Sequence, residues 1–107
     1  MLPNPSDSTG AYSSRVSIIV PVYNEAASID AVLQAIAASP VQKEVVPVDD
    51  GSTDGTREKL LRLVPSDTPT IIFHEGNFGK GAAIRTGLHY ARGEYILIQD
   101  CDLEYDP

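Results

Sequence analysis

The sequence predicts an α/β fold in which a Rossmann-like parallel sheet carries helices on its faces. Short runs of apolar, largely β-branched residues alternate three times with stretches whose apolar residues recur at helical spacing. The helical stretches are long enough to cross from one strand to the next, so the strands are expected to lie parallel. With 107 residues, 42% of them hydrophobic, the chain is expected to bury one modest core.

The first strand–helix unit begins at residue 16. Residues 16–22 (VSIIVPV) form a short run rich in Val and Ile, which predicts a strand. Apolar residues then recur at helical spacing with alanines between them, at Ile29, Val32, Leu33 and Ile36. This pattern predicts a helix that packs against the sheet.

The second unit repeats this order. Residues 44–48 predict a strand, although Pro47 removes one backbone donor and favours an irregular or edge position in the sheet. Turn residues at 49–55 lead into a second helix, which is expected to end at Pro65. The apolar positions of this helix are Leu60, Leu61 and Val64.

The third unit completes the alternation. Residues 70–74 predict a strand, and residues 76–81 predict a glycine-rich loop. A third helix follows, with one face formed by Ile84, Gly87, Leu88 and Ala91. Residues 95–99 predict a fourth strand, whose composition indicates burial; a chain that stops soon after it would leave this strand as an unpaired edge.

A polar loop follows each predicted strand. The four loops are residues 23–25, 49–52, 74–81 and 100–106. The carboxyl ends of parallel strands meet at one edge of a sheet, and α/β proteins bind their ligands at that edge. The four loops are therefore expected to converge on one binding site.

Charge and composition exclude several classes of function. A net charge of −7 and a pI near 4.5 argue against non-specific binding to nucleic acid or to an anionic membrane surface. Residues 1–15 are rich in Ser and Pro and are expected to form a flexible leader, neither a signal peptide nor a span. No window approaches the roughly 20 apolar residues of a membrane-spanning helix. Cys101, His74 and His89 are interpreted as structural residues.

Asp49 and Asp50 lie at the mouth of the second strand. Two adjacent carboxylates repel each other, which favours a ligand that offers donors, such as a base edge or ribose hydroxyls. Ser52, Thr53 and Asp54 are better explained as capping and turn residues of the next helix.

Residues 77–83 (NFGKGAA) resemble a phosphate loop but match neither common pattern. A Walker A loop requires Ser or Thr directly after its lysine, whereas here Gly81 follows Lys80. The dinucleotide fingerprint fails at Ile84. What remains is a turn that opens a helix, where Lys80 either meets an anion or is a solvated side chain.

The acidic segment at residues 100–106 allows three interpretations. A calcium loop would need Gly where Tyr105 stands and a glutamate at its twelfth position. A phosphatase with an Asp nucleophile also places Asp-x-Asp after a strand, but that signature normally opens the domain. A divalent cation that bridges a diphosphate fits best, with Asp100 and Asp102 as its ligands.

Taken together, four motifs resemble the amino-terminal half of a family 2 glycosyltransferase of the GT-A fold, and most of all the bacterial relatives of dolichyl-phosphate mannosyl- and glucosyltransferases. The motifs are residues 16–25 (VSIIVPVYNE), 48–56 (VDDGSTDGT), 79–87 (GKGAAIRTG) and 100–107 (DCDLEYDP). The resemblance implies that residues 16–107 form the nucleotide-sugar-binding half of a GT-A domain, truncated after Asp-x-Asp. Two positions depart from the family pattern: Cys101 replaces the more usual Ala, and Pro47 interrupts a strand that is generally aliphatic.

The resemblance also implies a set of nucleotide-sugar-binding residues, namely Pro21, Tyr23, Glu25, Asp49, Asp50, Lys80 and Asp100. The first three would line the nucleoside pocket, and the adjacent Asp pair would contact the base or the ribose. A Mg²⁺ or Mn²⁺ ion on the diphosphate would be held by Asp100 and Asp102. Such a cation stabilises the leaving nucleoside diphosphate as a Lewis acid.

In this family the catalytic base and the acceptor site come from the half that follows Asp-x-Asp, so catalytic residues are expected beyond Pro107. The resemblance implies a nucleotide-sugar donor and a lipid-phosphate acceptor, such as a polyprenyl phosphate, or a saccharide acceptor. It implies a cytoplasmic location or the cytoplasmic face of a membrane, with any membrane association made by the C-terminal part. These 107 residues alone are expected to be inactive. Two alternatives stay open: an Asp-nucleophile phosphatase, and a truncated nucleotide-binding fragment without catalysis.

Overall fold

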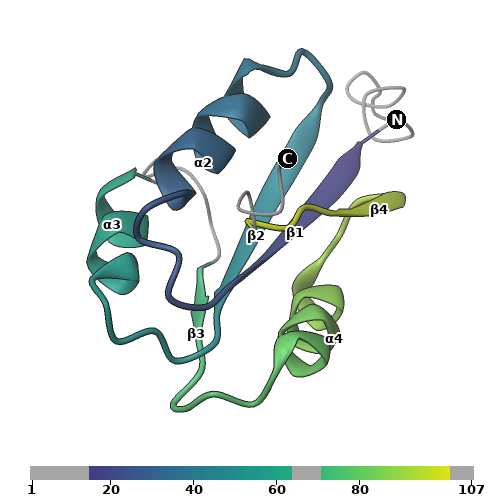
Figure 1. Ribbon diagram of the computed structural model, residues 1–107. Coiled ribbons are helices and arrows are strands. Elements are labelled where there is room, and N and C mark those ends of the chain that lie inside the picture. The colour runs from purple at the N-terminus through teal and green to yellow at the C-terminus, as the bar shows by residue number, and fades with distance from the viewer. Residues whose placement is uncertain (1–14, 64–70, 102–107) are drawn as a thin grey trace, which may run out of the picture.

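Figure 1 shows one sheet with helices on both of its faces, in a computed structural model that describes residues 15–63 and 71–101. The strands are β1 (Val16–Val22), β2 (Lys43–Asp49), β3 (Ile72–Phe73) and β4 (Tyr95–Ile98). They lie in the order β3-β2-β1-β4, and each neighbouring pair is parallel. The predicted α/β fold with a parallel sheet and flanking helices is therefore confirmed.

The helices are α2 (Ile29–Ala38), α3 (Thr56–Leu63) and α4 (Lys80–Tyr90). Each follows the strand that the sequence predicts before it, although α4 begins four residues before its first predicted apolar position. No helix within the two described ranges is long and apolar enough to cross a membrane. Three predicted features lie outside the described residues, namely residues 1–14 of the leader, the helix end at Pro65 and the first residue of the third strand.

The central strand β1 supplies buried side chains to both faces of the sheet. The larger core cluster lies on the face covered by α2 and α3, and its buried members are Ile18, Val20, Val22, Ile29, Val32, Ile36, Leu60 and Cys101. The smaller cluster lies on the face covered by α4, and its buried members are Ile19, Val46, Val48 and Ala83. Successive residues of a strand point to opposite faces, so a continuous apolar run such as β1 suits a strand covered on both sides.

Helix α4 approaches β1 closely because small residues lie at the contact. A Cβ atom on Gly87 would lie 2.5 Å from Cγ2 of Ile19. Gly87 and Ala83, one turn earlier, are the buried residues of the helix. The predicted apolar face is therefore corrected, because Leu88 is 47% exposed and Ala91 caps the end of the helix.

Strand β2 is an interior strand, so the predicted edge position for Pro47 is wrong. β2 pairs with β1 along its whole length and with β3 at Val48 and Asp49. Asp50 donates its N–H to Val22 O at 2.8 Å, toward β1. Backbone N–H groups alternate between the two sides of a strand, so position 47 faces the β3 side, where the ladder begins only at Val48. The proline therefore costs no ladder bond with β1.

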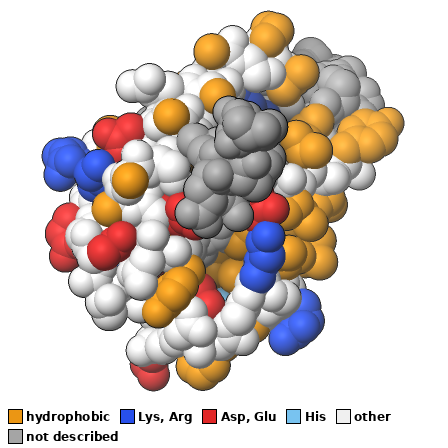
Figure 2. Space-filling view, viewed as in Figure 1, with side chains coloured by type: hydrophobic (Ala, Val, Ile, Leu, Met, Phe, Trp, Pro, Cys, Tyr) orange, Lys and Arg blue, Asp and Glu red, His pale blue; other side chains and the backbone are white. Residues whose placement is uncertain are grey.

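Strand β4 is exposed, contrary to the burial that its composition indicates. Tyr95, Ile96, Leu97 and Ile98 are 61%, 42%, 51% and 44% exposed. Figure 2 shows hydrophobic side chains gathered on the side of the molecule where β4 and α4 lie. Within the described part of the chain, β4 pairs on one side only, with β1, which agrees with the predicted unpaired edge.

A polar cluster fastens the segment between α4 and β4 to the amino-terminal edge of the sheet. The buried Ser17 hydroxyl is donated to Glu44 Oε2 and accepts the N–H of Gly93. The same Glu44 oxygen accepts the N–H of Arg92, whose Nε lies 3.5 Å from Oε1. Burial raises the pKa of Glu44, but the hydrogen bonds from Ser17 and Arg92 and the charge of Arg92 outweigh it and hold the pKa below its ordinary 4.5.

Replacing Glu44 with Gln is expected to lower the free energy of unfolding at neutral pH by about 1 kcal/mol, because it weakens these charge-assisted hydrogen bonds. The pKa of Glu44 is lowered in the folded state, so its stabilisation is fully present above 4.5 and is lost as the pH falls through the folded pKa. The variant should therefore lose less stability on acidification, as measured by urea unfolding over that range. Glu58→Gln, at an exposed position of α3, is the control and should change stability by less than about 0.5 kcal/mol. If the unfolding free energy of Glu44→Gln fell as steeply with decreasing pH as that of the wild type, the stabilisation by the ionised Glu44 would be contradicted.

Candidate functional site

An open pocket of about 260 Å³ lies at the carboxyl ends of the strands. From β1 the chain proceeds to β2 and β3 on one side, whereas β4 lies on the other side of β1. Ligands of parallel α/β sheets bind where the strand order reverses in this way. Six of the seven predicted binding residues line this pocket: Pro21, Tyr23, Glu25, Asp50, Lys80 and Asp100. The predicted convergence of the polar loops on one edge is confirmed.

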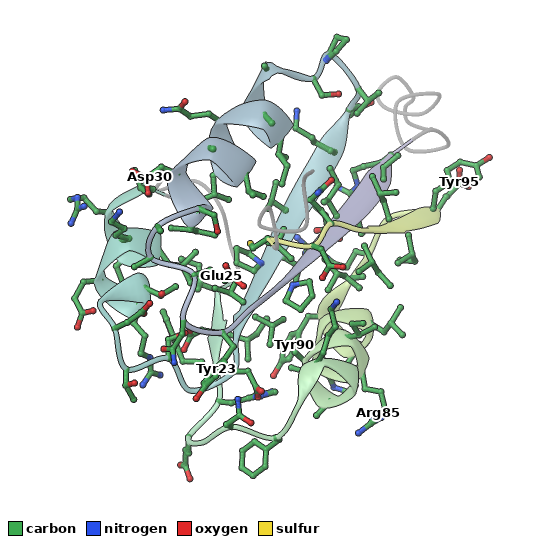
Figure 3. The ribbon with its side chains drawn as sticks, in the orientation of Figure 1. Tyr23, Glu25, Asp30, Arg85, Tyr90 and Tyr95 are labelled. Carbon is green, nitrogen blue, oxygen red and sulfur yellow. The ribbon has the colours of Figure 1, made fainter. Side chains whose placement is uncertain are left out.

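The loop between β1 and α2 brings Tyr23 and Glu25 to the pocket, as Figure 3 shows. Asn24 between them has a left-handed backbone with φ of 52°, a conformation that Asn adopts more readily than most residues. Tyr23 is 45% exposed, so its side chain is accessible from solvent. Ser28 Oγ lies 2.9 Å from both Glu25 Oε1 and the carbonyl oxygen of Cys101, which connects this loop to the segment after β4.

The loop between β2 and α3 is hydrogen-bonded to the β1–α2 loop. Asn24 donates its N–H to Ser52 Oγ at 2.8 Å, and its side-chain oxygen accepts the N–H of Thr53 at 2.8 Å. Glu25 donates its N–H to Thr56 Oγ1 at 3.0 Å, and Ala26 donates its N–H to Asp54 at 3.3 Å. Asp54 also accepts the N–H of Thr56 at the start of α3. The expectation that these polar residues serve a turn and a helix start is met.

Asp49 is fully buried and does not line the pocket. Its Oδ2 accepts the N–H groups of Gly51 and Ser52 at 3.2 and 3.0 Å, and Arg57 Nε lies 3.4 Å away. Its Oδ1 is buried without a hydrogen-bond partner among the described residues. That Asp49 contacts a base or ribose stays a prediction, and the geometry assigns it to the turn after β2.

Asp50 lines the pocket and organises the loop before α4. Its Oδ1 lies 2.7 Å from His74 Nδ1 and accepts the N–H of Phe78 at 3.0 Å. Its Oδ2 accepts the N–H of Gly79 at 2.8 Å. Burial raises the pKa of Asp50, but these hydrogen bonds and the neighbouring His74 outweigh it and hold the pKa below its ordinary value. Asp50 is therefore a carboxylate at neutral pH.

Lys80 and Asp100 meet across the pocket. Lys80 is the first residue of α4, and its Nζ lies 2.6 Å from Asp100 Oδ1. Both side chains are about half exposed, 57% and 48%, so both can reach a ligand. The ammonium group of Lys80 thus contacts Asp100, one of the two predicted metal ligands. The Asp100 carboxylate is therefore accessible to a positively charged group.

Asp102, the second predicted metal ligand, lies outside the described residues. Within residues 15–63 and 71–101 no group of three or more His, Cys, Asp or Glu side chains could hold a metal ion. Asp100 still suits a hard cation, because Mg²⁺ takes one or two carboxylates and completes its coordination with phosphate oxygens and water. The donors that the described part provides therefore fit a cation that arrives with a diphosphate.

Cys101 is the buried neighbour of Asp100. Burial raises the pKa of its thiol to about 12, and the charges of Glu25 and Asp100 add to this effect. The thiol is therefore protonated at neutral pH and is a poor nucleophile and metal ligand. Its membership of the larger core cluster agrees with the predicted structural role.

Sequence reasoning did not predict the hydrogen bonds that link Asp50 to His74 and to the backbone of residues 78–79, or the bond between His74 and Thr86. His74 has no second histidine or cysteine at metal-ligand spacing, and its partners lie 24 and 12 residues away. Its position at the end of a predicted strand, at the binding edge of the sheet, is the one signal that could have indicated a role near the site.

Comparison with known proteins agrees with this geometry. A family model described as glycosyl transferase family 2 matches residues 17–107. The dodecaprenyl-phosphate galacturonate synthase of Rhizobium johnstonii is 36% identical over 101 residues, which cover 89% of this chain and 30% of the relative. The chain thus spans less than a third of the length of the curated relatives that it matches.

Solved structures show the same arrangement. The mannosyltransferase PcManGT from Pyrobaculum calidifontis, in complex with GDP-Man and Mn²⁺, superposes with a TM-score of 0.77 at 37% identity, over 85% of this chain and 28% of that one. S. aureus TarS 1-349 in complex with UDP-GlcNAc superposes with a TM-score of 0.75 at 33% identity, over 82% of this chain and 26% of that one.

Proposed function

The chain belongs to glycosyl transferase family 2, and from this premise we propose that residues 16–107 are the donor-binding half of an enzyme that transfers a sugar from a nucleoside diphosphate sugar to an acceptor. The observation that carries the proposal is the pocket at the strand ends, into which both Lys80 and Asp100 open. A diphosphate needs positive charge to bind, and a chain of net charge −7 must supply that charge locally.

The predicted residues that line the pocket receive roles from their positions and chemistry. The exposed Tyr23 ring offers a face on which a base can stack. Pro21 and Glu25 form the wall on the same side. Lys80 lies at the start of α4, where backbone N–H groups and the helix dipole also favour a phosphate. Asp50 keeps the loop before α4 in place and has little acceptor capacity left for a base or ribose.

Asp100, together with Asp102, would hold a divalent cation on the diphosphate. The similar mannosyltransferase PcManGT was solved in complex with GDP-Man and Mn²⁺. A bound Mg²⁺ or Mn²⁺ supplies Lewis-acid stabilisation of the charge that develops on the leaving nucleoside diphosphate. Lys80 would turn from Asp100 toward the phosphates, and Tyr23 would hold the nucleoside.

The acceptor proposed here is a polyprenyl phosphate, because the names of the curated relatives include dodecaprenyl phosphate and undecaprenyl phosphate. The acceptor site and the catalytic residues are proposed to lie in the part of the relatives that this chain does not match. A phosphatase, which Asp-x-Asp alone would permit, is not supported, since the family match includes that motif and extends over the whole sheet.

The full-length protein is expected to bind UDP or GDP at least about 10-fold more tightly with Mn²⁺ than with excess chelator, because the cation neutralises the diphosphate beside the carboxylates. Calorimetric titration with each nucleotide measures this, with AMP as the control, because it has no diphosphate. Transfer from UDP- and GDP-linked sugars to polyprenyl phosphate then tests the acceptor. Failure of both nucleotides to bind in the presence of Mn²⁺ would refute the proposed function.

A further inference from the structure

His74 lies directly after β3, and both of its ring nitrogens are bonded. Nδ1 lies 2.7 Å from Asp50 Oδ1, and Nε2 lies 2.9 Å from Thr86 Oγ1 on α4. Its side chain is only 13% exposed, and the edge of its ring meets Phe78 at a centroid distance of 5.6 Å. His74 is not among the residues that line the pocket.

The hydrogen-bond partners define the protonation of the neutral ring. A carboxylate only accepts hydrogen bonds, so the hydrogen on the Asp50 side must be carried by Nδ1. Nε2 is then the acceptor, and the Thr86 hydroxyl is the donor. The two bonds hold the ring between β2 and α4, and they fix the rotation of the Asp50 carboxylate.

Asp50 transmits this restraint to the pocket. Its oxygens accept the N–H groups of Phe78 and Gly79, the two residues before Lys80. Gly79 has a left-handed φ of 99° and caps α4, so a shift of the carboxylate would move the start of the helix. Lys80 follows at once and reaches Asp100.

An Asp–His–hydroxyl series also occurs in nucleophilic triads, but Thr86 is not suited to that role. Thr86 lies on α4 and does not line the pocket, and Asp50 is bonded to two backbone N–H groups as well as to His74. We propose that His74 is instead a positioning residue for the donor: through Asp50 it places Gly79 and Lys80 so that they can bind the diphosphate. This inference rests on the proposed function.

Two substitutions of His74 separate positioning from mere stability. Asn places its amide N–H close to the position of Nδ1 and can still donate to Asp50, whereas Gln reaches toward the position of Nε2 and cannot make the same bond. In the full-length protein His74→Gln is expected to weaken binding of Mn²⁺ with UDP or GDP about 10-fold. His74→Asn should stay within about 3-fold of the wild type, because a donor to Asp50 remains.

Thr86→Val provides a second, independent variant. It removes the hydroxyl at Nε2 without touching the pocket and is expected to weaken the same binding about 3-fold, while Thr86→Ser should restore it. His89→Gln is the matched control, because His89 is the exposed histidine of α4 and contacts Tyr90 rather than the site. Thermal unfolding of every variant is measured alongside calorimetry with Mn²⁺ and UDP or GDP.

The outcomes separate the two proposals. Wild-type protein that binds neither nucleotide refutes the proposed function and this inference with it. Wild-type protein that binds, with His74→Gln binding equally well, refutes the inference alone. The inference is also refuted if the losses of nucleotide affinity parallel the losses of melting temperature and His74→Asn binds as weakly as His74→Gln. Such a result would indicate a purely structural role. Rescue by Asn at comparable melting temperatures supports it.

Discussion

Replacing Asp100 with Asn in the full-length protein is expected to weaken Mn²⁺-dependent binding of the nucleoside diphosphate by at least about 100-fold, since even residues that only support a metal ligand cost 10–100-fold. The substitution removes one negative charge and nearly preserves the shape of the side chain. It also removes the carboxylate that lies 2.6 Å from Lys80. Calorimetry measures the affinity. The same change at Asp102, which lies outside the described residues, is expected to act in the same direction.

The matched control for this substitution is Asp30→Asn. Asp30 is a carboxylate of α2 that is 46% exposed, close to the 48% of Asp100, and it also pairs with a lysine, Lys59, at 3.2 Å. The control repeats the charge change away from the pocket and should leave the affinity unchanged. If Asp100→Asn binds within about 3-fold of Asp30→Asn, Asp100 is not a metal ligand, because a lost ligand costs far more than that.

Replacing Gly51 with Ala is expected to lower the free energy of unfolding by about 3 kcal/mol or more, the sum of a backbone cost and a packing cost. Gly51 has φ of +85°, which L-residues rarely adopt. A Cβ atom there would lie 2.6 Å from the backbone carbon of Gly76. Backbone atoms cannot rotate away as a flexible side chain can, so the two loops must separate. Urea unfolding measures the loss.

Gly55→Ala separates these two costs. Gly55 has φ of +97°, close to that of Gly51, but no atom lies within 4 Å of its added Cβ. This control should therefore lose only the backbone cost of about 1–2 kcal/mol. Equal losses of unfolding free energy for the two variants would show that the contact between the added Cβ atom at position 51 and the Gly76 backbone costs no stability.

Apolar patterning and loop position predicted the sheet and its binding edge correctly, because both depend on local sequence. The pattern placed Gly87 correctly on the packed face of α4 but missed Ala83 and chose Leu88 instead, since a large apolar side chain carries a stronger signal than alanine. It also misjudged Pro47, whose effect depends on which side of the strand its missing N–H faces, a property of the register with β1 and β3.

The sequence predicted which residues form the candidate site, but it did not predict the hydrogen bonds between them. Six of the predicted residues line one pocket, because each lies near the end of a strand, follows a strand or opens a helix at the same edge of the sheet. The sequence could not indicate that Asp49 closes a turn while Asp50 bonds to His74, since adjacent carboxylates look alike until the backbone directs them to opposite sides of the strand. Partners that are 24 residues apart are set by tertiary structure alone.

The hydrogen bonds between the β1–α2 and β2–α3 loops have a consequence for exchanging parts between relatives. Asn24 bonds in both directions, to Ser52 through its N–H and to Thr53 through its side chain. A chimaera that imported a foreign segment 23–26 without Asn24 would leave the N–H of Thr53 without its acceptor. A foreign segment 52–56 would instead remove the side-chain acceptors of the N–H groups of residues 24–26. The two segments therefore form one hydrogen-bonded unit, in which a substitution of Asn24 or of the acceptor side chains in 52–56 costs a bond in the other segment. Redesign of this side of the pocket must therefore change both segments together.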